Sequence, residues 1–148
     1  GNEFTLTTQA GERYKALAVV YCAGKEYKRL GAVGEERFIG KGIAFCATCD
    51  APLYRGKTVA VVGGGNSAFT AIRDLAGFAA EIHLVHRRNE FRADAALVEA
   101  AKKAPNVKIH TPMEISEYLG EDKLTGIRLA STDGAPQQDL KWTACSWK

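Results

Sequence analysis

The stretch TVAVVGGGNSA, Thr58–Ala68, decides the fold. Its first five residues form an apolar, β-branched run with the length of a buried strand. Three glycines follow, and the spacing of Phe69, Ile72 and Leu75 then predicts a helix with one apolar face. Gly77 is well placed to end that helix. The stretch therefore predicts a strand, a tight glycine turn and a helix.

The turn itself fits the pattern G-x-G-x-x-[G/A], which is typical of dinucleotide-binding proteins. Gly63 allows a sharp turn, Gly65 lets a pyrophosphate approach the backbone, and Ala68 keeps helix and strand close. The free N–H groups and the positive dipole of the helix start then hold the phosphates. A merely tight turn is the alternative. We favour a cofactor site formed by Gly63, Gly64, Gly65, Asn66, Ser67 and Ala68.

The next strand, EIHLVHRR at 81–88, indicates which cofactor is bound. It ends in His86-Arg87-Arg88, and Arg92 lies one helical turn beyond. A protein selective for NAD has Asp or Glu here to bind the ribose 2′-hydroxyl. Guanidinium groups instead make bidentate, charge-assisted bonds to phosphate, which suit the 2′-phosphate of NADPH. A solvated surface cluster is the alternative, but the position favours NADPH over NADH.

Upstream, the stretch IAFCATCD places Cys46 and Cys49 three positions apart. A zinc half-site would need further ligands from Cys22, Cys145 or scattered histidines, none of which has a second paired spacing. Two inert buried thiols are a second interpretation. The third, a redox-active dithiol, is favoured because a neighbouring nicotinamide site supplies electrons, and Asp50 could move a proton.

A mediator is then needed, because hydride carries two electrons together and a disulfide is a poor direct acceptor. A flavin is the natural choice. The sequence contains no second glycine fingerprint to bind one.

The flanking segments complete an α/β prediction: a Rossmann-like dinucleotide-binding domain with a parallel sheet plus an antiparallel β-meander. At the amino end, two strands (4–8 and 14–21) precede a charged linker or loop at 24–42. Beyond the arginines, a helix at 94–103 precedes NVKIHT, EISEYLG and KLTGIRLAS, which predict the meander with turns at Pro112 and near Gly120.

Composition excludes several classes of protein. The chain has 148 residues, enough for one domain with a real core, and a net charge of +3, too small to indicate nucleic-acid binding. It has neither a membrane-spanning apolar run nor a signal-peptide pattern, and its four cysteines do not suggest a secreted disulfide framework. Because it begins at Gly1, we expect a piece of a longer protein.

The motifs CATCD, VAVVGGGNSA and LVHRRNEFRA, in this order, closely resemble the NADPH domain of the low-molecular-weight thioredoxin reductases. The similarity runs from about Gly31 to Leu140. The resemblance implies a cytoplasmic, homodimeric flavoprotein in which electrons pass from NADPH to FAD, to a redox-active disulfide, and then to thioredoxin. It divides the chain into a remnant of the FAD-binding domain (1–30), the NADPH-binding domain (31–141) and an anomalous tail (142–148).

The resemblance also implies roles for individual residues. Cys49 would face the flavin, Cys46 would attack the disulfide of thioredoxin, and Asp50 would be the acid. The six residues of the glycine turn would hold the pyrophosphate, and His86 would line the adenosine pocket. The 2′-phosphate site would consist of Arg87, Arg88 and Arg92.

Departures from the family pattern lie at both ends. The flavin fingerprint is absent, Cys22-Ala23-Gly24 replaces Ala-Thr-Gly, and the linker lacks its proline. We therefore expect no thioredoxin turnover by this chain alone. Residues 142–148 depart from the strand that the family has there, but a one-base shift permits a family-like Val-Asp-Gly-Val-Phe-Leu-Glu, in which the codons force the aspartate and the final glutamate and allow the other residues. We hypothesise a frameshift, which the coding DNA would decide.

Three alternatives remain. The flavoprotein subunit of alkyl hydroperoxide reductase has different residues between its cysteines and typically lacks the double arginine. A flavin-dependent reductase fed by ferredoxin would not need the intact glycine turn and arginines. A stand-alone NADPH-binding module would use the cysteines as a redox switch.

Overall fold

The computed structural model describes residues 3–22, 24, 28–141 and 146–147, and its centre is a five-stranded parallel sheet. The strand order is β3-β10-β4-β5-β6. Three strands have the spans β4 Thr58–Val62, β5 Glu81–Val85 and β6 Val107–His110, and two short ones are β3 Ile43–Ala44 and β10 Ser146–Trp147. The predicted strand after the cysteines and the predicted α/β class are both confirmed.

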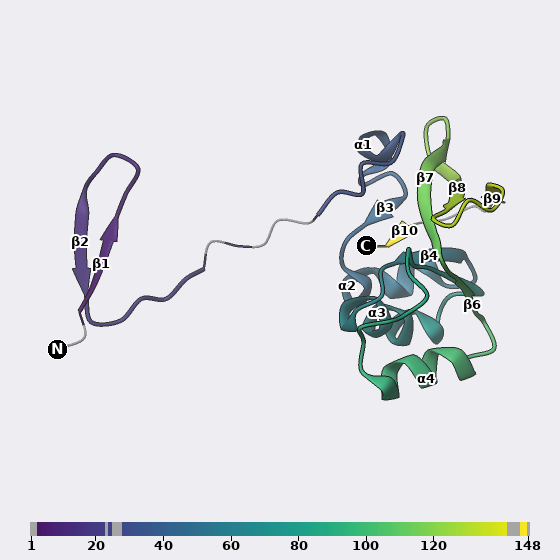
Figure 1. The fold of residues 1–148 in the computed structure, drawn as a ribbon, viewed down its shortest axis with the longest axis horizontal. Coiled ribbons are helices and arrows are strands. Elements are labelled where there is room, and N and C mark those ends of the chain that lie inside the picture. The colour runs from purple at the N-terminus through teal and green to yellow at the C-terminus, as the bar shows by residue number, and fades with distance from the viewer. Residues whose placement is uncertain (1–2, 23, 25–27, 142–145, 148) are drawn as a thin grey trace.

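Two helices, α3 (Asn66–Ala76) and α4 (Ala95–Lys103), cover one face of this sheet (Figure 1). The predicted apolar face of α3 is confirmed, since Phe69, Ile72 and Leu75 are all buried, and Gly77 caps the helix. The three apolar residues of α3 pack against alternate residues of β4 and β5, among them Val59, Val61, Ile82 and Leu84. Strand and helix are therefore fixed to each other directly behind the glycine turn.

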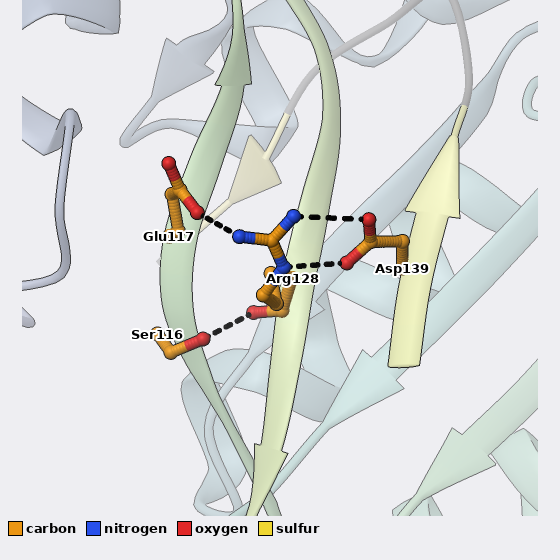
Figure 2. A network of polar contacts seen from close by, with 4 residues as sticks. All are labelled: Ser116, Glu117, Arg128 and Asp139. Carbon is orange, nitrogen blue, oxygen red and sulfur yellow. Dashed lines mark hydrogen bonds and ion pairs between the residues drawn. The ribbon is translucent and has the colours of Figure 1, made fainter. Parts of the chain in front are cut away.

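An antiparallel meander covers the opposite face. It consists of β7 (Met113–Gly120), β8 (Leu124–Ser131) and β9 (Gln138–Lys141). A second apolar cluster joins it to the sheet, through residues such as Ala60, Val85, Ile115, Ile127 and Leu129. On its outer side, Arg128 of β8 forms ion pairs with Glu117 of β7 and Asp139 of β9 (Figure 2).

The structure corrects two of the predicted strands. NVKIHT does not belong to the meander, because β6 pairs in parallel with β5 as the edge of the central sheet. The third strand of the meander is instead β9, a mostly polar segment that the pattern did not indicate. The peptide bond between Thr111 and Pro112 is cis, at the predicted turn between β6 and β7.

The amino-terminal hairpin, β1 (Phe4–Thr7) and β2 (Arg13–Ala16), forms its own sheet, apart from the other two (Figure 1). The second strand is shorter than predicted. The predicted linker contains a short helix, α1 (Glu35–Phe38), in which Glu35 and Phe38 are buried. The Glu35 carboxylate accepts hydrogen bonds from the backbone N–H groups of Leu30 and Gly31.

Of the predicted anomalous tail, residues 142–145 and 148 lie outside the described residues, and the other two residues form β10. None of the helices in the described part of the chain has the length and apolar character that crossing a bilayer requires.

Candidate functional site

A cavity of about 760 Å³ lies beside the carboxyl ends of β4 and β5. In open parallel sheets, ligands bind at these strand ends. The lining comes from four segments that are distant in sequence: Lys28, Arg29, Leu30, Gly31 and Ala32; Val62, Gly63, Gly64 and Ser67; Val85, His86, Arg87 and Arg92; and Met113, Glu114, Ile115 and Ser116. The cavity thus unites the glycine turn with the histidine and two of the arginines predicted from the sequence.

Each glycine of the turn has its own structural reason. Gly63 has φ 138°, a backbone conformation that side chains disfavour, and its N–H donates to Val85 O at 3.0 Å. A Cβ at Gly64 would overlap the His86 ring. A Cβ at Gly65 would meet no atom within 4 Å. The first two glycines are therefore required by the fold, whereas the third leaves open space in front of the helix.

The arginine-bearing loop is tied to the glycine turn by three hydrogen bonds. The Arg92 backbone N–H donates to Gly64 O at 2.7 Å. The Asn66 side chain donates to the Asp94 carboxylate at 3.0 Å and accepts from the Asp94 backbone N–H at 2.8 Å. Gly65, Asn66 and Ala68, all predicted as cofactor ligands, do not line the cavity. Asn66 holds the loop, and Ala68 is buried between helix and strand.

His86 lies between the turn and this loop. Its Nε2 is 3.1 Å from Glu90 O, and its ring lies against that of Phe91, with 5.4 Å between centroids. Burial lowers the pKa of His86, and the charges of Arg87, Arg88 and Arg92 lower it further, against the hydrogen bond to Glu90. The imidazole is therefore neutral at pH 7, with one ring nitrogen able to donate and the other able to accept.

The cavity lining has an excess of positive charge. Lys28, Arg29, Arg87 and Arg92 face a single carboxylate, Glu114, among the lining residues. Arg88 is exposed and is not part of the lining. A site of this charge with open space at Gly65 fits a ligand with several phosphates, such as a dinucleotide carrying a 2′-phosphate.

Sequence reasoning missed part of the lining. Lys28 and Arg29 lie in the segment that we interpreted as linker, where their charge was the available signal. Met113 also lines the cavity. It does so because β7 crosses the sheet there, which no local pattern indicated.

Cys46 and Cys49 form a disulfide, with 5.3 Å between their Cα atoms. They bracket the cysteine tetrapeptide, Cys46-Ala47-Thr48-Cys49, whose last three residues begin the short helix α2 (Ala47–Asp50). The 3₁₀ helix η1 (Ala51–Tyr54) follows. Cys46 is half-buried and Cys49 is exposed, so the pair is not inert by burial. Within the described residues, no cluster of His, Cys, Asp or Glu is suited to hold a metal ion.

The disulfide lies outside the cavity, and Asp50 follows it directly in the chain. The Asp50 backbone N–H donates to Cys46 O at 3.2 Å, which ties the backbone of the predicted acid to the first residue of the tetrapeptide. Neither cysteine lines the cavity. Cys22 is a free, exposed thiol, and Cys145 lies outside the described residues. Cavity and disulfide are therefore separate sites on one α/β unit.

Comparison with known proteins gives the following matches. The model of the family described as pyridine nucleotide-disulphide oxidoreductase matches residues 1–141. The chain is 50% identical over 122 residues to a thioredoxin reductase of Mycoplasma genitalium, covering 82% of this chain and 39% of that protein. It is 40% identical over 131 residues to an alkyl hydroperoxide reductase subunit of Pseudomonas putida, covering 88% of this chain and 25% of that protein.

A solved structure is similar over the same region. The thioredoxin reductase of Giardia duodenalis superposes with a TM-score of 0.87 at 28% identity, covering 99% of this chain and 52% of that one. The chain thus spans about half or less of each protein that it matches.

Proposed function

The chain belongs to the pyridine nucleotide-disulphide oxidoreductase family, and we propose that it is the NADPH-binding, disulfide-bearing part of a thioredoxin reductase-like flavoprotein. In this proposal, residues 31–141 are the NADPH-binding domain and residues 1–30 belong to the FAD-binding domain. The complete protein acts as a homodimer, reduces thioredoxin or a similar small redox protein, and works in the cytoplasm.

The observation that carries the proposal is the meeting of the glycine turn, His86 and two arginines on one positively charged cavity. The open space at Gly65 and the N-terminus of α3 suit a pyrophosphate. Arg87 and Arg92 suit the 2′-phosphate, since a guanidinium bonds phosphate through two N–H groups. Neutral His86, beside Phe91, suits an adenosine. Arg88 stays in the proposed 2′-phosphate site, although it does not line the cavity.

When bound, NADPH supplies a hydride, that is, two electrons and one proton. The complete protein would use FAD to pass these electrons to the disulfide. The described residues contain no second glycine-rich turn between a strand and a helix to hold a flavin.

The protein's own chemistry takes place at the disulfide. Two electrons and two protons convert the bond between Cys46 and Cys49 into two thiols. We assign Cys46 as the thiolate that attacks the disulfide of the partner and forms a mixed disulfide. Cys49, assigned to the flavin side, then attacks Cys46 and releases the partner as a dithiol. Asp50, beside the pair, is the proton donor or acceptor.

A second candidate is a reductase of the alkyl hydroperoxide reductase type, which the 40% identity to such a protein supports. We place it behind the first because the identity to a thioredoxin reductase is higher and the double arginine is present. The stand-alone redox switch has no comparable support.

Competition between 2′,5′-ADP and 5′-AMP tests the proposal. These ligands share the adenosine and 5′-phosphate and differ in the 2′-phosphate alone. We expect 2′,5′-ADP to displace NADPH from the chain at concentrations at least tenfold lower, monitored by nicotinamide fluorescence. Equal displacement by the two ligands would remove the basis for an NADPH site.

A further inference from the structure

We infer that Asp74 of α3 is a positioning residue for the disulfide, acting through Thr48. The Thr48 hydroxyl donates to Asp74 Oδ2 at 2.7 Å. Thr48 lies between the two cysteines, and Asp74 lies 26 positions further along the chain. The bond therefore ties the middle of the cysteine tetrapeptide to the helix that begins at the nucleotide cavity.

The place of Asp74 on α3 supports a specific task for this carboxylate. It lies in the last turn of the helix, where the helix dipole disfavours negative charge. Of its two neighbours in sequence, Leu75 is fully buried and Arg73 is exposed, so Asp74 lies at the edge of the buried face of α3. The Asp74 side chain is only 19% exposed, so its position is fixed by the packing of the helix.

The two oxygens of Asp74 are divided between two partners. Nε and Nη2 of Arg73 donate to Oδ1, at 3.3 and 3.2 Å. Oδ2 is then directed to the Thr48 hydroxyl. The positive charge of Arg73 thus offsets the negative charge of Asp74 near the helix end, and Asp74 in turn holds the tetrapeptide through Thr48.

Such a tether favours the disulfide over the dithiol. Reduction breaks the bond between the sulfur atoms and lets the tetrapeptide relax. A contact that keeps Thr48 on α3 opposes this relaxation and keeps one sulfur near the other. A contact made better in the oxidised form than in the reduced form shifts the equilibrium toward the oxidised form. Losing it should therefore make the disulfide easier to reduce.

This inference rests on the proposed function in one respect: the disulfide must form and be reducible. The equilibrium between the Cys46–Cys49 disulfide and its dithiol can be measured with dithiothreitol, which donates two electrons and two protons and becomes a cyclic disulfide. Trypsin cleaves after Lys41 and Arg55, releasing Gly42–Arg55, a peptide whose only cysteines are Cys46 and Cys49. Alkylation of the quenched mixtures and mass spectrometry of this peptide then give the ratio of dithiol to disulfide.

We expect Thr48→Val, which keeps the shape and removes the hydroxyl, to shift the equilibrium toward the dithiol by about threefold, or about 14 mV for two electrons. Asp74→Ala should do the same. The double variant Thr48→Val/Asp74→Ala should be no further shifted than either single variant, because both remove one bond. Thr48→Ser, which retains the hydroxyl, and Glu99→Gln, an exposed carboxylate change on α4, should match the unmodified chain.

The outcomes separate the two proposals. A chain that forms no disulfide in Gly42–Arg55 under oxidising buffer contradicts the proposed function. A disulfide whose equilibrium is the same in the unmodified chain, Thr48→Val and Asp74→Ala overturns the positioning role alone. If Asp74→Ala does not fold, the contrast between Thr48→Val and Thr48→Ser decides, since Thr48 is exposed.

Discussion

The cavity and the cysteine tetrapeptide are built in opposite ways. The cavity is assembled from four distant segments, and its turn is fixed by backbone bonds and by the packing of His86 against Gly64. The tetrapeptide is local, largely exposed, and held to α3 through Thr48. A site that must hold a large ligand is preformed, whereas a site that must change its covalent structure is accessible and lightly held. The same helix supports both, with Ser67 in its first turn at the cavity and Asp74 in its last turn at the tetrapeptide.

The largest effects should come from the glycine turn, the most tightly packed part of the cavity. In Gly64→Ala, the new methyl group would overlap the His86 ring. This overpacking should lower the free energy of unfolding by about 1–3 kcal/mol. NADPH binding should be lost with it, because His86 must move. Thermal unfolding and titration with NADPH measure both effects.

Gly65→Ala is the matched control. Its Cβ meets no protein atom within 4 Å and its φ of −108° suits any residue, so thermal unfolding should change little. If the pyrophosphate approaches this point, NADPH affinity should still fall at least tenfold. Unchanged affinity in Gly65→Ala would place the phosphates elsewhere in the cavity.

The next effect concerns the two arginines that line the cavity. Arg87→Gln and Arg92→Gln should each weaken NADPH by about tenfold, the usual worth of a charge-assisted hydrogen bond, and weaken NADH much less. Arg88→Gln, outside the lining, should have the smaller effect. Titration of the three variants with both nucleotides ranks them, and a loss that is equal for NADPH and NADH would argue against a 2′-phosphate contact.

Much of the fold around the cavity, and the cysteine pair itself, could be predicted from the sequence. The turn, α3 and β4 followed from one short run, β5 followed from EIHLVHRR, and Phe69, Ile72 and Leu75 are buried as expected. Cys46 and Cys49 were singled out by spacing alone, and they form a disulfide.

What the sequence did not reveal depends on long-range pairing. The strand Val107–His110 carries no mark of whether its neighbour runs parallel, so it was assigned to the meander. Lys28 and Arg29 reach the cavity from a segment without periodicity. The bond from Thr48 to Asp74 joins residues far apart, and only Thr48 belongs to a motif, CATCD.

Acid should lower the stability of the fold through the histidines of the central sheet. The three histidines lie on or directly after β5 and β6, and Nδ1 of His83 is 2.8 Å from Nε2 of His110. Burial lowers the pKa of both, with Glu81 and Lys108 as the nearby charges. The unfolded chain then binds protons more readily, so stability is full above pH 6.5 and falls below it.

Urea midpoints at pH 7.5 and 5.5 measure this loss. His83→Asn and His110→Asn, which cannot titrate, should each reduce the difference between the two midpoints. A midpoint that does not change with pH in the unmodified chain would contradict the neutral pairing of these imidazoles.

The smallest effect should come from Arg128, which lines neither the cavity nor the tetrapeptide. Its ion pairs with Glu117 and Asp139 raise the pKa of Arg128 and lower that of Asp139, but they lie at the surface, where such pairs contribute little. Arg128→Ala should lower the melting temperature by about 2 °C or less and leave NADPH affinity and the disulfide equilibrium unchanged. A large change in NADPH affinity or in the disulfide equilibrium would mean that the meander is energetically coupled to that site.

The central claim is that a helix start and neighbouring guanidinium groups select a dinucleotide with a 2′-phosphate. Isothermal titration calorimetry of the unmodified chain with NADPH and with NADH, in the same low-salt buffer, tests it most directly. The account predicts that NADPH binds at least tenfold more tightly, with an advantage that shrinks as salt is added. Equal or tighter binding of NADH would contradict it.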